Sequence, residues 1–139
     1  MNAIEDFLPV LLRVCAVLQI AVAFLNFMLV RLMNWRPQLE RMEPLVREVF
    51  MVHLLFISAI LLIFGVLTWQ FAFDMADGTN DVATWLCAAI AIFWGVRVVL
   101  QVTYYSSRHW RGKVPQTIAH VVLLVMYGGM TVIYGAAAW

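Results

Sequence analysis

The stretch "IFWGVRVVLQVTYY", residues 92–105, decides how this chain folds, because it sets one arginine and one glutamine in an almost unbroken apolar run. Bulky aliphatic and aromatic residues flank Arg97 and Gln101 on both sides. A guanidinium keeps its charge in proteins, so within an apolar helix it needs a partner or a polar surrounding. The stretch therefore indicates a membrane-spanning helix with one polar face, and it raises the question of what Arg97 faces.

The composition of the whole chain also indicates a membrane environment. Of its 139 residues, 65% are hydrophobic and only 12% are charged. A soluble domain of this length has too much surface for its volume to bury so many apolar side chains. We therefore expect an integral membrane protein whose first partner is the lipid bilayer. Its basic residues form no patch beyond short loops, so no nucleic-acid partner is expected.

Four segments reach the roughly 20 apolar residues that are needed to cross the hydrocarbon. They cover about residues 9–33, 44–71, 82–105 and 115–138. Because the backbone must satisfy its own hydrogen bonds in lipid, these segments are expected to be helices. The prediction is an all-α integral membrane protein, a single four-transmembrane-helix bundle over residues 1–139, with a short connector at 37–43. The first span is expected to be a retained helix rather than a signal peptide, since its leader "MNAIEDF" is acidic.

The charges are segregated along the chain. Two loops carry basic residues, which are Arg31, Arg36, Arg41, Arg47, Arg108, Arg111 and Lys113. The opposite ends of the spans carry mainly acids, which are Glu5, Asp6, Asp74, Asp77 and Asp81. The positive-inside rule then places both basic loops in the cytoplasm and both termini on the extracytoplasmic side. We expect a multi-pass protein of a bacterial inner membrane.

The segment "DMADGTND", residues 74–81, holds closely spaced acids that invite comparison with a calcium loop. It lacks the ligand spacing and the terminal bidentate glutamate of an EF-hand. Glycine at position 78 is instead typical of a turn. We therefore expect a solvated turn at Gly78.

Each predicted span carries one amide or imidazole side chain five to seven residues from the charged end of its basic loop: Asn26, His53, Gln101 and His120. A difference of two residues is about 3 Å along a helix, so the four side chains are expected at one depth. Helical spacing also groups polar residues into stripes. One stripe holds Trp94, Arg97, Gln101 and Tyr104, and the other holds Gln116, His120, Tyr127, Thr131 and Tyr134.

These stripes predict a buried polar pocket in the cytoplasmic half of the bundle, with Arg97 facing His53 and His120. The most specific chemistry for such a pocket is haem b, which needs two imidazoles from different helices at matched depth. His53 and His120 would be the two metal ligands. The rest of the predicted cofactor-binding set consists of Arg97, Gln101, Trp94, Tyr127 and Asn26. The function expected from this set is electron transfer to or from a quinone, as a membrane subunit of a larger complex.

Two other functions remain open at this level. In a lipid- or prenyl-substrate-binding protein, Arg97 would anchor an anionic group and His53 or His120 would act as acid or base. No carboxylate lies deep in any span to orient such a histidine. In a non-catalytic anchor or assembly subunit, the polar residues would hold helices together within this chain, a homo-oligomer or a complex with other subunits. The last span offers a small-residue surface for such packing, made of Gly128, Gly129, Gly135 and residues 136–138.

Overall fold

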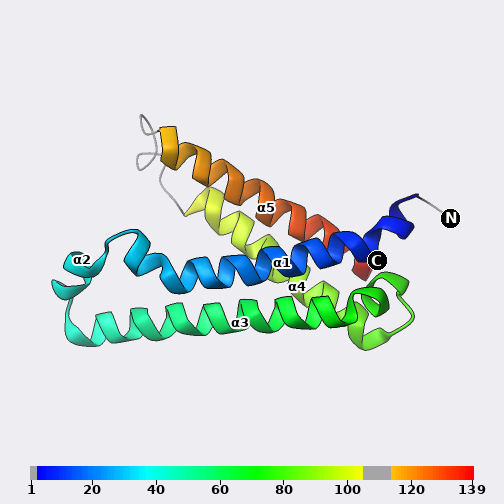
Figure 1. The fold of residues 1–139 in the computed structure, drawn as a ribbon, viewed down its shortest axis with the longest axis horizontal. Coiled ribbons are helices and arrows are strands. Elements are labelled where there is room, and N and C mark those ends of the chain that lie inside the picture. Colours follow the sequence, from blue (N-terminus) through cyan, green and yellow to red (C-terminus); the bar gives the residue numbers. More distant parts are fainter. Residues whose placement is uncertain (1–2, 105–113) are drawn as a thin grey trace. The chain divides into compact units, whose positions relative to one another are not determined.

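The structure is a computed structural model that describes residues 3–104 and 114–139. The described part is helical throughout apart from short turns and contains no strand. Four long helices dominate it, and a short helix α2 (Arg36–Glu40) connects the first two (Figure 1). The long helices are α1 (Ala3–Leu32), α3 (Pro44–Asp77), α4 (Asp81–Thr103) and α5 (Val114–Ala138). All four are long and apolar enough to cross a membrane, which confirms the predicted helical class and the four long apolar helices.

The start of the first helix differs from the prediction. We expected the helix to begin at Pro9, where a proline is compatible with the first turn. In the structure α1 begins at Ala3 and Pro9 lies inside it. Its missing N–H removes a single hydrogen bond from the second turn, close to the end where bonds are absent anyway. A proline therefore marks a helix start only to within about two turns.

The second span is also longer than predicted. Its expected end, Phe71, has non-helical backbone angles (φ −107°, ψ 20°), so the helix is kinked there and continues to Asp77. The turn after it contains Gly78 with φ +65°, a left-handed conformation that suits glycine. Asn80 then caps α4, since its Oδ1 accepts from the N–H groups of Val82 (3.0 Å) and Ala83 (3.3 Å). The predicted turn is confirmed.

The helices fall into two compact units. The α1–α3 unit comprises residues 13–70, which hold most of α1, α2 and most of α3. The α4–α5 unit comprises residues 1–12 and 71–139, which hold the two outer ends of α1 and α3 together with α4 and α5. A single four-helix bundle, its insertion in a membrane and the side on which its termini lie stay predictions.

Within the α1–α3 unit, the two long helices lie side by side (Figure 1). They approach each other closely at Gly65, where an added Cβ would lie 2.6 Å from Ile20 Cγ1 and 3.0 Å from the carbonyl oxygen of Ala16. Towards one end the guanidinium of Arg13 lies over the ring of Trp69, 5.4 Å from its centroid. The glycine thus permits a close backbone approach that a larger side chain would prevent.

Within the α4–α5 unit, α4 and α5 pack against each other. Ile90 and Trp94 on α4 and Met130 and Tyr134 on α5 are all almost completely buried. Gly95 lies against α5, since a Cβ there would be 3.5 Å from Thr131 Cγ2. This helix pair carries the polar stripes that the sequence singled out.

Candidate functional site

An aromatic pair lies at the centre of the interface between α4 and α5. The rings of Trp94 and Tyr127 are stacked, with centroids 5.0 Å apart and an interplanar angle of 24°. Both residues are buried. Offset stacking of this kind contributes about 0.5–1.5 kcal/mol beyond the burial of area. The pair therefore fixes how the two helices face each other at this level.

Arg97 lies one turn along α4 from Trp94 and points toward the same partner. Its guanidinium carbon is 5.4 Å from the centroid of the Tyr127 ring, within range of a cation–π interaction. Arg97 is half-buried. The arginine of the 92–105 stretch thus faces α5, with an aromatic face below its charge.

Gln101, one further turn along α4, bonds to His120 of α5. Gln101 Nε2 lies 2.8 Å from His120 Nδ1, and Gln101 is 5% exposed. With the amide in this orientation its N–H donates to Nδ1, so the imidazole proton is on Nε2. Gln101 Oε1 is buried and accepts no hydrogen bond from the described residues. Buried amide groups are nearly always paired, so an oxygen without a hydrogen-bond donor is unusual here.

The other residues of the two stripes differ in their exposure and in their contacts. Tyr104, placed by its spacing on the polar face of α4, is 82% exposed. The hydroxyl of Thr131 donates to the carbonyl oxygen of Tyr127 in its own helix, at 2.9 Å. Tyr134 is buried, as its stripe predicted. The side chain of Gln116 and the basic residues Arg108, Arg111 and Lys113 lie outside the described residues.

Asn26, part of the predicted cofactor-binding set, belongs to the α1–α3 unit and joins its two helices. Its Nδ2 donates to Ser58 Oγ at 3.0 Å and to the carbonyl oxygen of Leu54 at 3.2 Å. The hydroxyl of Ser58 in turn donates to the same carbonyl at 2.8 Å. Sequence analysis missed Ser58, although it lies between apolar residues of the second span as a small polar side chain that can bond across helices.

His53 lies on the same helix as Ser58 and is exposed. Its Nδ1 is 2.8 Å from the carbonyl oxygen of Val49. A carbonyl can only accept, so Nδ1 carries a proton, and in the neutral imidazole Nε2 then carries the lone pair. His53 and His120 belong to different units, so their predicted pairing around a haem stays a prediction.

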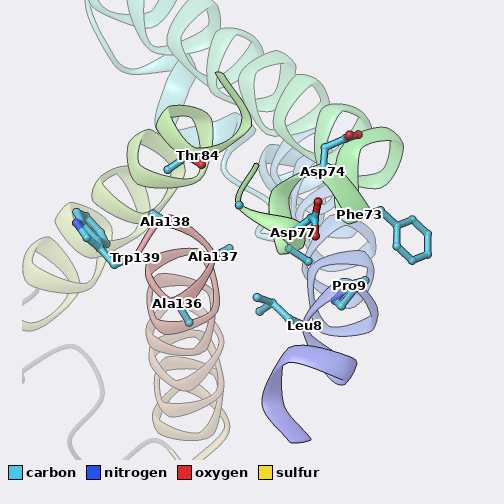
Figure 2. A pocket seen from close by; sticks show the side chains of 12 residues that line it. Leu8, Pro9, Phe73, Asp74, Asp77, Thr84, Ala136, Ala137, Ala138 and Trp139 are labelled. Carbon is cyan, nitrogen blue, oxygen red and sulfur yellow. The ribbon is translucent and has the colours of Figure 1, made fainter. Parts of the chain in front are cut away.

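A separate cavity of about 670 Å³ lies among the acidic ends of the helices in the α4–α5 unit (Figure 2). Leu8 reaches from α1 toward the alanines at the end of α5, whereas the ring of Phe73 points away from them (Figure 2). Asp74 and Asp77 are the charged residues in its lining, and Asp77 Oδ2 already accepts a hydrogen bond from the Thr79 hydroxyl at 2.9 Å. We assign no ligand to this cavity.

Arg97, Gln101 and His120 together form a polar cluster between the two helices, which we call the α4–α5 layer. It combines a cation (Arg97), an imidazole (His120) and an unpaired amide oxygen (Gln101). Such a layer can form hydrogen bonds and exchange protons beside a fixed positive charge. Among the described residues no three His, Cys, Asp or Glu side chains lie close enough together to hold a metal ion. Comparison of the chain with protein-family models, with curated proteins and with solved structures finds no match.

Proposed function

We propose that this protein is a membrane subunit of quinone-linked electron transfer, and that the α4–α5 layer binds the ring of an isoprenoid quinone or quinol. The observation that supports the proposal is the buried oxygen of Gln101, which has no hydrogen-bond donor among the described residues. Leaving such a group unpaired costs about 1–3 kcal/mol, and hydrocarbon offers no water to reduce that cost. A ligand that donates a hydrogen bond here removes it. A quinol hydroxyl is such a donor, and an isoprenoid tail is soluble in the bilayer.

The neighbouring side chains suit the oxidised form of the ligand as well. A quinone presents only acceptors, so it needs donors, and Arg97 and His120 both supply N–H groups. Arg97 lies four residues from Gln101, which is about 6 Å along the helix. Oxidation of a quinol releases two protons and two electrons, and the electrons would pass one at a time to a one-electron acceptor such as a haem. His120, in contact with Gln101, has an imidazole that can take one of these protons when it does not bind iron.

The amide of Gln101 can serve either ligand form. If its oxygen and nitrogen are exchanged, Oε1 accepts from His120 Nδ1–H and the NH₂ group takes the buried position. That end would donate to a quinone carbonyl. The quinone assignment therefore allows either orientation of the amide, with a quinol at its oxygen or a quinone at its NH₂ group.

The same proposal assigns haem b to His53 and His120. His53 fits as a ligand, because the Val49 carbonyl holds its Nδ1–H and leaves the Nε2 lone pair available, as in metal-bound imidazoles oriented by a backbone carbonyl. His120 would bind iron only with the Gln101 amide exchanged, because its Nδ1 then carries the proton and its Nε2 carries the lone pair. An iron-bound His120 has no lone pair left to take a proton from the quinol, so its two proposed roles are alternatives. A haem held in this way would supply one-electron transfer.

A second function, a non-catalytic anchor or assembly subunit, is favoured by the same contacts. Trp94 with Tyr127, Arg97 with Tyr127, and Gln101 with His120 each join α4 to α5. Polar contacts between membrane helices typically stabilise by about 0.6–2 kcal/mol each. With this function the layer holds the helix pair together and takes no ligand.

The substitution Gln101→Leu distinguishes the two functions. Leucine has a similar volume and removes both ends of the amide. With the quinone function, the detergent-purified wild type binds decylubiquinol in a calorimetric titration, and Gln101→Leu weakens binding about tenfold, the effect of roughly one lost hydrogen bond. With the packing function, the wild type binds no quinol and Gln101→Leu lowers the melting temperature.

Thr103→Val is the matched control on the same helix. The Thr103 hydroxyl is exposed and donates only to the carbonyl oxygen of Val99 in α4, at 2.8 Å. Its removal is expected to change neither binding nor stability. A wild type that binds neither decylubiquinol nor the corresponding quinone contradicts the proposed quinone site.

Haem is tested separately by the absorption spectrum of the purified protein. A Soret band that is lost in His53→Ala and in His120→Ala is the expected result. A colourless protein from haem-replete cells contradicts the haem assignment and leaves the quinone assignment intact, because the latter depends on Gln101.

A further inference from the structure

The α1–α3 unit contains a groove of about 760 Å³ where α1, α2 and α3 meet. Its charged lining residues are Arg31, Arg36, Glu40, Arg47 and Glu48. Each of the three helices contributes at least one arginine. The groove lies outside the α4–α5 layer, so a ligand bound in it is independent of the proposed quinone function.

The arginines of the groove are not engaged by the rest of the described chain. The side chains of Arg31, Arg36 and Arg47 have no ion pair, hydrogen bond or ring contact with the described residues. The two carboxylates in the lining, Glu40 and Glu48, offset two of the three positive charges and leave the groove with a net charge of +1. An anionic group with a single charge neutralises that excess.

The opposite end of the groove is apolar. Phe27 and Met28 lie one turn before Arg31 on α1, and Met51 and Val52 lie one turn after Arg47 and Glu48 on α3. These four side chains are 43–63% exposed within the chain. One helical turn is about 5.4 Å, so the lining of the groove changes from charged to apolar within that distance. In a phospholipid, the charged headgroup gives way to the apolar acyl chains over a similar distance. A ligand that fits both ends must be amphiphilic.

We infer that this groove binds a phospholipid with a singly charged phosphodiester and an uncharged headgroup alcohol, of the phosphatidylglycerol type. Guanidinium groups bind phosphate oxygens through paired hydrogen bonds. Basic pockets on the cytoplasmic side of membrane proteins favour anionic lipid headgroups, and the loop that holds this groove is the one that the charge distribution assigns to the cytoplasm. The acyl chains lie along Phe27, Met51 and Val52.

The inference is tested with the full-length protein in detergent micelles, titrated with phosphatidylglycerol, phosphatidylethanolamine and phosphatidylcholine of identical acyl chains and read by native mass spectrometry. Phosphatidylglycerol is expected to be retained preferentially. Arg36→Gln and Arg47→Gln are each expected to reduce its retention about fivefold, the effect of one basic residue at an anionic lipid surface. Both side chains lie at helix starts outside the buried core, so unchanged melting temperatures are expected to show that folding is intact.

Arg41→Gln is the matched control. Arg41 belongs to the same loop, carries the same charge and is exposed, but it does not line the groove. Its substitution is expected to leave retention within twofold of the wild type. A loss as large as that of Arg36→Gln would overturn the inference, because it would show diffuse attraction to the basic loop.

Two other results would also overturn it. Equal retention of phosphatidylcholine and phosphatidylglycerol would mean that the headgroup is not selected. Preferential retention of phosphatidylethanolamine that is lost in Glu40→Gln would mean that the carboxylates bind an ammonium group, and the ligand would then be zwitterionic.

Discussion

The substitution Gly65→Ala is expected to destabilise the contact between α1 and α3. The new Cβ would lie 2.6 Å from Ile20 Cγ1 and 3.0 Å from the carbonyl oxygen of Ala16. Carbon atoms in favourable contact are about 3.5–4.0 Å apart. The Ile20 side chain can rotate away, but the Ala16 carbonyl belongs to the helix backbone and can move only with α1. Overpacking of this kind costs about 1–3 kcal/mol.

The measurement is the melting temperature in detergent, followed by circular dichroism, of Gly65→Ala beside Gly128→Ala. Both changes add one methyl group to a glycine inside a long apolar helix. Nothing lies within 4 Å of a Cβ at Gly128, so this control measures the change in helix propensity without a clash. The difference between the melting temperatures of the two variants therefore reports the cost of overpacking at Gly65.

The double variant Gly65→Ala with Ile20→Ala separates the two clashes. Removing the Ile20 side chain beyond Cβ eliminates the shorter contact, so the double variant is expected to be more stable than the sum of the two single effects predicts. The stability that is still lost in the double variant reports the contact of the new methyl group with the Ala16 carbonyl oxygen. If Gly65→Ala is as stable as Gly128→Ala, the close approach of α1 and α3 at this position is refuted.

Three further sets of substitutions test individual contacts within the two units. Asn80→Ala removes the cap of α4 and is expected to lower the free energy of unfolding by about 1 kcal/mol, measured by denaturant titration; no change would mean that the cap is not formed. Asn26→Leu and Ser58→Ala are expected to show a coupling energy of about 0.6–1.7 kcal/mol in a double-mutant cycle, and additive effects would exclude their hydrogen bond. Tyr127→Leu is expected to reduce the near-ultraviolet circular dichroism of Trp94, its stacking partner, and an unchanged spectrum would argue against the stack.

The helices could be predicted from the sequence because lipid leaves the backbone few alternatives. Long apolar runs had to be helical, and α4 (Asp81–Thr103) lies within about two residues of its predicted bounds. The ends were less predictable. Helix α1 runs through Pro9, and α3 continues past the kink at Phe71 into polar sequence, since neither a proline in the second turn nor a local distortion ends a helix.

The α4 stripe shows what helical spacing can and cannot predict. The intervals of three and four residues place Trp94, Arg97 and Gln101 on one face, and the structure has all three in contact with α5. Spacing could not give their partners, because these depend on the rotation of α5. It also could not show that Tyr104, at the end of the same stripe, is exposed.

The depth of a residue along a helix and its angle around the helix axis are separate quantities. Whether a histidine faces another helix depends on the angle. Asn26 bonds to Ser58, so the face of α3 that bears Ser58 is turned toward α1. His53 lies five residues earlier, which is a rotation of about 140° around α3. The contact that pairs Asn26 therefore turns His53 away from α1, in agreement with its exposure. A ligand of His53 Nε2 would therefore lie on the side of α3 that faces away from the contact between Asn26 and Ser58.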